Sequence, residues 1–288
     1  NDGLVTVNFL NTTYRVNGQL ESLQDRIDFI NLVLKDAYSN TATLNGNLQH
    51  HDFNDFQINL KGNFKNFQTM NTTAKNNPIF YGQTYATGTV SFSGPVNNLR
   101  ISATARTDKN TKIYIPINST GSVERGEFIR FVNLKDSVNK EEEDVAAIRK
   151  VKSNFSVNLN LDITPDAYAE IIFDIKAGDI IRGWGKGDLK IDMDTQGDFS
   201  MFGIYEFDRG FYNFTLGGVI NKEFTINKGS KISWYGDPYT ANLSINAAYR
   251  QLASLAPILF TATENNPVPP SLRRKFPIEV SLALEGPM

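Results

Sequence analysis

The chain has 288 residues, of which 29 are basic and 31 acidic, so its formal net charge of −2 creates no general field that would recruit nucleic acid or an anionic membrane surface. It contains no cysteine, which excludes disulfides, thiolate zinc sites and a cysteine nucleophile and fits either a reducing cytosol or a disulfide-poor bacterial envelope. The N-terminus shows neither a Met nor a signal segment, and no apolar run approaches the roughly 20 residues that span a bilayer, so we expect a mature or excised chain.

The first 47 residues begin with alternation and continue into an ambiguous segment. Val5, Val7 and Phe9 alternate with polar residues, which is typical of a strand with one buried and one solvated face. Within residues 20–38, four apolar residues could share one face of a helix: Leu23, Ile27, Ile30 and Leu34. Residues 28–36 could equally form a strand. We therefore expect leading strands and a helix or strand in residues 1–47.

Residues 48–136 predict a series of strands. Apolar residues alternate with polar ones in four stretches: Phe56, Ile58 and Leu60; Val90 and Phe92; Leu99, Ile101, Ala103 and Ala105; and Ile113, Ile115 and Ile117. Turn signals at Gly94-Pro95 and at residues 108–110 separate these stretches by short spacings. Such spacings favour antiparallel hairpins over helical crossovers.

Residues 137–152 predict a short exposed helix inserted between strands, or a disordered insertion. Asn139 is a candidate N-cap with Glu142 three residues further on. Acidic residues come first in this segment and basic residues last, which suits the helix dipole.

Residues 153–288 return to strands. The alternating stretches include Val157, Leu159, Leu161 and Ile163; Leu189, Ile191 and Met193; Ile171, Phe173 and Ile175; and Leu243, Ile245, Ala247 and Tyr249. The sequence Trp234-Tyr235-Gly236-Asp237-Pro238 predicts a corner between two strands, because its proline cannot donate to a ladder. Residues 265–270 predict an extended loop. Alternation continues to the last residues, so we interpret the chain as a fragment of a longer protein.

These patterns predict an all-β fold, a loose array of hairpins without a fixed repeat. Phenylalanine is frequent, at 20 residues, and recurs on the alternating rows. The apolar face could close against a second sheet as the core of a sandwich, which composition alone favours. Alternatively, a single sheet could curl into an open trough whose lining binds acyl chains.

No residue pattern predicts catalysis, a metal site or a cofactor. His50 and His51 are adjacent, so in a strand they would point to opposite faces, and we interpret them as a loop pair without a ligand role. Residues 183–187 are rich in glycine but lack a following Lys-Ser or Lys-Thr, which indicates a turn or bulge. The carboxylates of Asp188, Asp192 and Asp194 share one strand face, which we interpret as solvated.

The stretch from Asp188 to Arg250 resembles the C-terminal part of the TamB family, a family of the translocation and assembly module that is also called DUF490. The matching segments are the strand at residues 189–193, Gly203-Ile204-Tyr205, Arg209-Gly210-Phe211-Tyr212-Asn213-Phe214, Phe224-Thr225-Ile226 before Gly229-Ser230, and Trp234-Tyr235-Gly236-Asp237-Pro238 leading to Ala247-Ala248-Tyr249. Upstream, Tyr81-Gly82, Gly88 and Gly94-Pro95 resemble the family's Bacteroidota members, so that the likeness covers about residues 48–285.

This resemblance implies a long curled sheet, a β-taco with a lipid-binding groove. It implies a periplasmic protein of a Gram-negative bacterium that is anchored in the inner membrane when full-length and works with an Omp85-type outer-membrane barrel such as TamA. The implied function is phospholipid transport between the two membranes in outer-membrane biogenesis, with a chaperone or scaffold for outer-membrane protein assembly as the alternative. A carbohydrate-binding or hydrolytic β-protein would instead need a polar cleft with paired carboxylates. The residues expected to line the groove are Phe92, Ile101, Ile115, Leu159, Ile171, Phe173, Ile191, Phe199, Phe214, Phe224, Trp234 and Ile245.

Overall fold

The computed structural model describes residues 3–116, 154–174, 178–196, 198–216, 220–259 and 268–287. Within these ranges nearly all regular structure is strand, which confirms the predicted all-β class. The strands are β1 (Gly3–Val7), β2 (Thr12–Ser22), β3 (Arg26–Lys35), β4 (Thr41–His51), β5 (Asn54–Thr72), β6 (Tyr81–Pro95), β7 (Asn98–Thr107), β8 (Lys112–Pro116), β9 (Asn154–Ile163), β10 (Tyr168–Asp174), β11 (Asp179–Asp194), β12 (Phe199–Leu216), β13 (Ile220–Ile226), β14 (Lys231–Gly236), β15 (Asn242–Ser254) and β16 (Lys275–Pro287). Two single turns of 3₁₀-helix, η1 (Asn8–Leu10) and η2 (Pro238–Thr240), and two four-residue helices, α1 (Ala256–Leu259) and α2 (Pro270–Arg273), complete the described elements.

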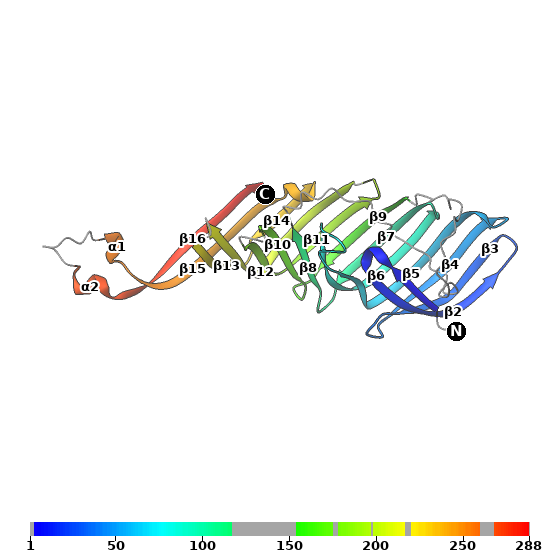
Figure 1. The fold of residues 1–288 in the computed structure, drawn as a ribbon, viewed down its shortest axis with the longest axis horizontal. Helices are drawn as coiled ribbons and strands as arrows, with labels where there is room; N and C mark the ends of the chain where they lie inside the picture. The colour runs from blue at the N-terminus through cyan, green and yellow to red at the C-terminus, as the bar shows by residue number, and fades with distance from the viewer. Residues whose placement is uncertain are drawn as a thin grey trace, which may run out of the picture.

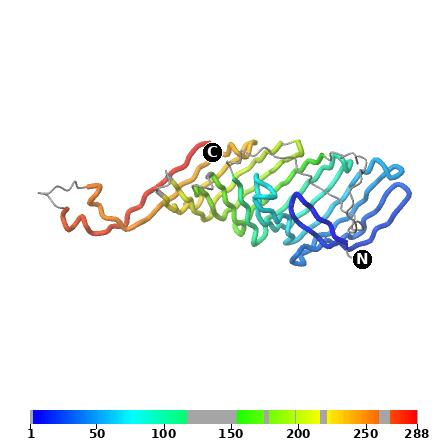
Figure 2. The backbone as a smooth tube through the Cα atoms, in the orientation of Figure 1, coloured from blue at the N-terminus to red at the C-terminus, as the bar shows by residue number. Residues whose placement is uncertain are grey.

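All of these strands join in one sheet that runs the length of the molecule (Figure 1). Sequential strands pair antiparallel from β1 to β7, as the short turn spacings predicted. The order then departs from the sequence, because β7 pairs parallel with β9 and β8 pairs parallel with β10. The backbone trace in Figure 2 shows the chain advancing along the long axis from the N-terminal to the C-terminal end.

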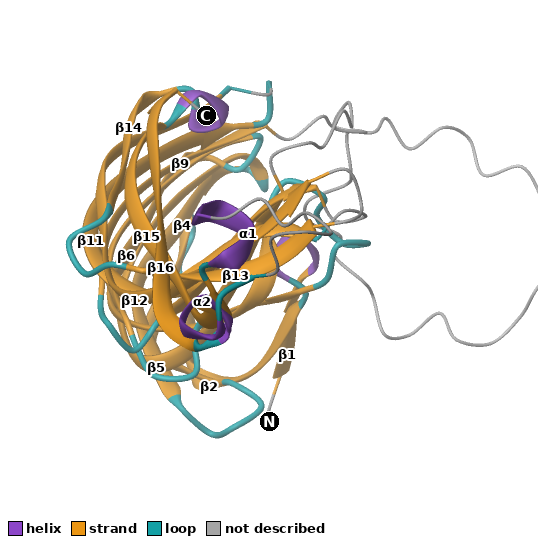
Figure 3. Cartoon of the chain, turned by 90° about the vertical axis from the view of Figure 1, so that its left-hand side faces the viewer, coloured by secondary structure: helices purple, strands orange, loops and turns teal. Residues whose placement is uncertain are grey.

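The sheet folds over along its length into two walls. The first half of β6 pairs with β8 and its second half with β7; similarly, β11 pairs with β10 through residues 179–184 and with β9 through residues 187–194. β12 repeats the pattern with β14 and β13. We call one side of the folded sheet the long wall. It consists of β3, β4, β7, β9, β14, β15 and β16 with the adjoining halves of β5, β6, β11 and β12. The short wall consists of β8, β10 and β13 with the other halves. Viewed end-on, the sheet is curled (Figure 3).

A line of local irregularities marks the corner between the walls. Asn66 has a φ of 48° at a bulge in β5, and the register of β11 against β12 shifts between Trp184 and Gly185. Bulges bend a strand and raise its local twist, which lets long strands pass from one wall to the other. The predicted turn or bulge at residues 183–187 is therefore confirmed, and it serves this bend.

Two apolar clusters join the walls. The larger lies toward the C-terminal end, where Ile181 and Tyr212 of the short wall pack with Leu189, Met201 and Ile232 of the long wall and their neighbours. We call it the C-terminal core. The smaller, the N-terminal core, consists of Tyr14, Ala42 and Phe67 with half-buried neighbours. Burial between two faces of one curled sheet thus supplies the cohesion of the fold.

The possible helix predicted for residues 20–38 is wrong and the alternative, a strand, is confirmed, because β2 and β3 occupy this segment. β3 is paired on both sides, with β2 and with β4, so its backbone groups find partners in two ladders. Tertiary pairing therefore overrides the helical spacing of the apolar residues. The expected helix at residues 139–152 lies outside the described residues. The boundary drawn at residue 47 falls inside β4, which forms a ladder with β5 from Thr41 to His51.

Candidate functional site

The inner face of the long wall carries a row of apolar side chains that lie directly opposite one another on neighbouring strands. Six strands, β5, β6, β7, β9, β11 and β12, contribute one residue each: Leu60, Phe92, Ile101, Val157, Met193 and Phe199. Leu60 is buried and the other five are half-buried. A second row beside it contains Val90, Ala103, Leu159 and Ile191, all half-buried. We call the two rows together the inner apolar face.

The outer face of the same strands is polar. The residues adjacent to the first row on each strand form an outward-facing row: Lys61, Ser91, Ser102, Asn158, Asp192 and Ser200. Asp192 accepts a hydrogen bond from Asn158 Nδ2 and lies 3.3 Å from Lys190 Nζ. Because side chains alternate between the faces of a strand, one sequence pattern produces both the apolar interior and this hydrated exterior.

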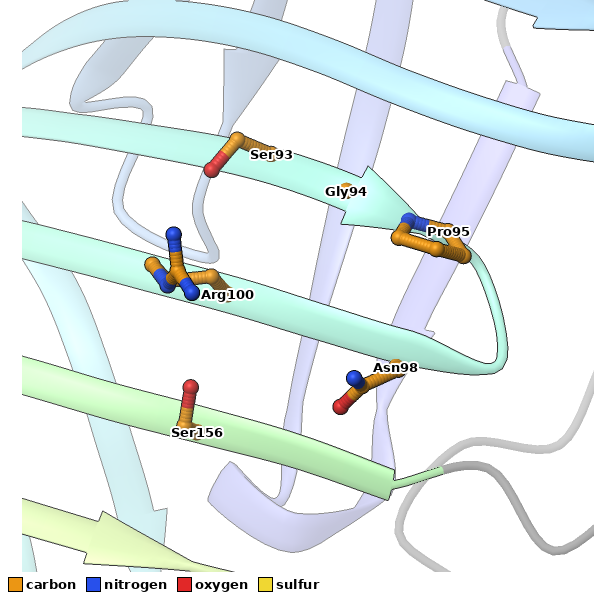
Figure 4. A pocket seen from close by; sticks show the side chains of 6 residues that line it. All are labelled: Ser93, Gly94, Pro95, Asn98, Arg100 and Ser156. Carbon is orange, nitrogen blue, oxygen red and sulfur yellow. The ribbon is translucent and has the colours of Figure 1, made fainter.

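Two surface concavities lie on this polar side. One, of about 300 Å³, is lined by Ser93, Gly94, Pro95, Asn98, Arg100 and Ser156 (Figure 4). The other, of about 540 Å³, lies over the Ser, Thr and Asn side chains of the same central strands. The second concavity also has Val90 and Ala103 among its lining residues, and neither concavity is lined by a pair of carboxylates.

The described part of the inner apolar face ends at an aromatic contact between the rims of the two walls. Phe80 directly precedes β6 at the rim of the short wall, and its ring centroid lies 6.2 Å from that of Phe199 at the rim of the long wall. Phe9, in η1, lies 6.3 Å from Phe80 and 6.2 Å from Phe155, the second residue of β9. We call these four residues the rim bridge. All four are half-buried, and they place aromatic rings between the interior and the solvent.

The two cores close the interior on either side. In the C-terminal core, Ile171, Ile181, Tyr212 and Phe224 lie opposite one another across the short wall and face the long wall. Burial raises the pKa of the Tyr205 and Tyr212 hydroxyls in this core. In the N-terminal core, Tyr14 stacks on Phe67 at 4.7 Å and donates a hydrogen bond to the Gln68 carbonyl, and burial raises the pKa of Tyr14 to about 12.

The residues predicted to line a groove fall into two groups. Ile171, Phe224, Trp234 and Ile245 are buried in the C-terminal core, so a ligand could touch them only if that core opened. The other eight are half-buried: Phe92, Ile101, Leu159, Ile191 and Phe199 on the inner apolar face, Ile115 on the neighbouring short wall, and Phe173 and Phe214 against the C-terminal core. That these residues contact lipid remains a prediction.

The titratable residues form structural contacts. Lys228 Nζ lies 2.9 Å from Asp208 Oδ1 near the corner, and this contact lowers the pKa of the Asp208 carboxyl and raises that of Lys228. His50 is buried, stacks on Phe53 at 4.5 Å and accepts a hydrogen bond from the Phe53 backbone amide. Within the described ranges, no group of three His, Cys, Asp or Glu side chains is placed to hold a metal ion.

Sequence reasoning missed the rim bridge. Phe9 was assigned to a regular alternating strand, whereas it lies in η1, and Phe80 stands in a turn after Pro78 without any periodic pattern. The four rings come from positions between 9 and 199, and nothing in the spacing of the sequence indicates that they meet.

Among the described residues, no helix combines the length and apolar character that a membrane crossing requires. The family model described as the TamB C-terminal domain matches residues 31–288 of the chain. The comparisons with curated proteins and with solved structures gave no match.

Proposed function

The chain belongs to the TamB C-terminal domain family, and we propose that it carries phospholipid acyl chains along its inner apolar face, as a segment of a bridge between the inner and outer membranes. Membership associates the chain with the translocation and assembly module of the cell envelope. The bridge, its lipid cargo and its periplasmic place are the proposed part.

The observation that carries the proposal is the half-buried inner apolar face. Five of the six residues in its first row keep part of their surface uncovered by the described residues, on five neighbouring strands of the sheet. Apolar surface of this extent gains free energy when it is covered, at about 25 cal/mol for each Å² removed from water. An acyl chain laid across the strands would cover it without any specific polar contact.

The polar headgroup would stay at the rim. The interior rows of the central strands are apolar, so a charged phosphate drawn between the walls would be desolvated without a partner. At the rim the headgroup can remain in water while the acyl chain enters. The proposed function therefore requires neither a catalytic residue nor a cofactor, and we propose that the protein is not an enzyme.

The full-length protein would connect the two membranes. We place this chain in the periplasm of a Gram-negative bacterium, with an inner-membrane anchor outside the present sequence and an Omp85-type barrel such as TamA as its outer-membrane partner. Support for these assignments comes from family membership alone.

Photo-crosslinking with matched positions on opposite faces tests the proposal. A photoreactive amino acid at Phe92 or Leu159 faces the interior, whereas the same group at the neighbouring Ser91 or Asn158 faces outward from the same strands. We expect irradiation with vesicles of phosphatidylethanolamine and phosphatidylglycerol to attach phospholipid at the two inner positions and not at the two outer ones, as read by mass spectrometry.

Equal capture on both faces would indicate adventitious contact and would contradict the proposal, as would no capture at the inner positions in a folded protein. Ile245, which is fully buried in the C-terminal core, provides a further control, since it should capture lipid far less than Phe92.

The alternative is a scaffold for outer-membrane protein assembly that acts by strand addition. The observation that favours it is β16, which in the described part of the chain pairs only with β15 and so presents a second edge. Cysteine pairs between β16 and an Omp85-type partner would form disulfides under this alternative, whereas inner-face lipid capture would not be needed.

A further inference from the structure

β15 and β16 form a hairpin that extends beyond the strands next to it. β14 and β13 pair with β15 only between Asn242 and Ala248, whereas the β15–β16 ladder continues to Ser254 opposite Lys275. Figure 1 shows this hairpin projecting from the end of the sheet, with α1 and α2 at its far end. We call residues 249–259 and 268–280 the arm.

The inner face of the sheet continues onto the arm, where part of its apolar surface is exposed and Gln251, opposite Ile278, interrupts the apolar row. Tyr249 lies opposite Val280, and Ala253 lies opposite Phe276. Both positions continue the row that begins with Ile245 and Ala247 in the C-terminal core, yet Val280 and Phe276 are exposed because the described strands of the short wall do not reach them.

The far end of the arm adds aliphatic side chains that no core covers. Ile258 and Leu259 in α1 are 74% and 63% exposed, and Leu252 on β15 is 65% exposed. Large aliphatic side chains concentrated at one projecting end are a feature of surfaces that meet another apolar phase.

Basic residues stand beside these side chains. Arg273, Arg274 and Lys275 are consecutive and exposed between α2 and the start of β16, and none of them pairs with an acidic residue in the described part of the chain. The acidic residue of the arm, Glu279, is held by Arg250 at 2.6 Å. The local charge is therefore positive although the whole chain has a formal charge of −2.

We infer that the arm docks on an anionic phospholipid bilayer surface, with Ile258 and Leu259 entering the interface and the three basic residues contacting lipid phosphates. Aliphatic insertion combined with a basic cluster is the composition that favours interfacial binding. A folded protein partner fits less well, because stable protein interfaces take about 800 Å² from each partner and the arm ends in two short helical turns.

The arm continues the proposed lipid-carrying face toward the proposed docking surface. The half-buried Tyr249 and the exposed Val280 and Phe276 lie between the C-terminal core and the far end of the arm. Bilayer docking itself does not depend on lipid carriage, so the two proposals can fail separately.

Vesicle co-sedimentation of the full chain tests the docking. We expect binding to phosphatidylcholine vesicles that contain phosphatidylglycerol and weak binding to phosphatidylcholine alone. Joint replacement of Arg273, Arg274 and Lys275 by Gln should weaken binding to the anionic vesicles by at least about tenfold, since each basic residue adds to attraction at the surface. The pair Ile258→Ser and Leu259→Ser should weaken binding to a similar extent.

Matched controls lie far from the arm. Lys61→Gln, Arg100→Gln and Lys190→Gln remove three exposed charges from the long wall, and Leu4→Ser with Leu20→Ser removes two aliphatic side chains of similar exposure near the N-terminus. These controls should bind like the unmodified chain. Arm variants that bind normally, or controls that lose as much binding, would overturn the inference, as would a chain that ignores vesicles and binds a protein through the arm. Unchanged lipid capture at Phe92 in the arm variants would separate this result from the test of the proposed function.

Discussion

At the scale of single residues, Trp234 shows how one side chain secures the corner that its sequence predicts. Trp234 is buried in the C-terminal core, and its indole Nε1 donates a hydrogen bond of 3.1 Å to the Pro238 carbonyl beyond the turn. Asp237 in turn accepts a hydrogen bond from the Tyr239 backbone amide at the start of η2. The same ring thus ties β14 to the turn and to the interior.

We expect Trp234→Ala to lower the free energy of unfolding by about 3–5 kcal/mol, because it removes a large buried ring and leaves a cavity. Urea unfolding measures the change. Tyr235→Ala is the matched control, since the neighbouring Tyr235 points to the other face and is 72% exposed, and it should cost far less. A Trp234→Ala protein as stable as the Tyr235→Ala protein would show that the ring does not anchor the corner.

The raised pKa of the buried Tyr14 hydroxyl predicts that the protein loses stability in alkaline solution. Burial raises its pKa in the folded protein from 10.0 to about 12, so the unfolded chain loses this proton first as the pH rises. The contribution of the protonated Tyr14 hydroxyl to the free energy of unfolding is fully present below pH 10 and is lost between about pH 10 and 12. The difference between the pKa of Tyr14 in the unfolded and the folded protein corresponds to about 2–3 kcal/mol of the free energy of unfolding.

Unfolding free energies measured from pH 8 to pH 11 should therefore fall less steeply for Tyr14→Phe than for the unmodified chain. The variant should also lose about 1 kcal/mol at neutral pH, because the hydrogen bond to the Gln68 carbonyl disappears. An alkaline slope in Tyr14→Phe equal to that of the unmodified chain would contradict the assignment.

At the scale of elements, the rim bridge combines residues from η1, the turn before β6, and the first residues of β9 and β12. These elements belong to opposite rims of the curled sheet, and aromatic contacts of about 6 Å each contribute about 0.5–1.5 kcal/mol beyond area burial. Three ring contacts thus hold the bridge at the rim end of the inner apolar face.

If acyl chains enter at this rim, Phe80→Ala should speed the uptake of a fluorescent fatty acid several-fold, because two ring contacts across the rims are removed. Stopped-flow fluorescence measures the rate. Phe202→Ala on the outer face of β12 is the control and should leave the rate unchanged. A slower or unaltered rate in Phe80→Ala would place the entry elsewhere.

Elements were predicted well where the alternation was long. The stretches from Val157 to Ile163 and from Leu189 to Met193 form β9 and the second half of β11, with their apolar residues on one face. Residues 20–38 were ambiguous because short apolar runs satisfy both periods, and pairing with two neighbouring strands decides the outcome. The parallel pairing of β7 with β9 carries no local signal, since it joins residues more than 50 positions apart.

At the scale of the whole molecule, the curled sheet buries one part of its apolar face, half-buries a second part and leaves a third part exposed. The two cores are closed because both walls meet there, while the inner apolar face between them stays half-buried. On the arm, Val280 and Phe276 of the same face are exposed because the described strands of the short wall do not reach them. The core, the candidate lipid contact and the exposed inner-face residues of the arm, Val280 and Phe276, therefore differ in what covers them, and hardly in residue type.

Long alternation predicted strands such as β9 and the face to which their side chains point, and Gly236 with Pro238 predicted the corner after Trp234, because a period of two residues and the backbone limits of Gly and Pro act over a few positions. The same alternation does not predict that Ile245 is core whereas Leu159 is half-buried and Val280 exposed. All three occupy the same apolar face in the same pattern. Their difference depends on whether a strand from a distant part of the chain lies above them, and burial of this kind is a property of the folded sheet as a whole.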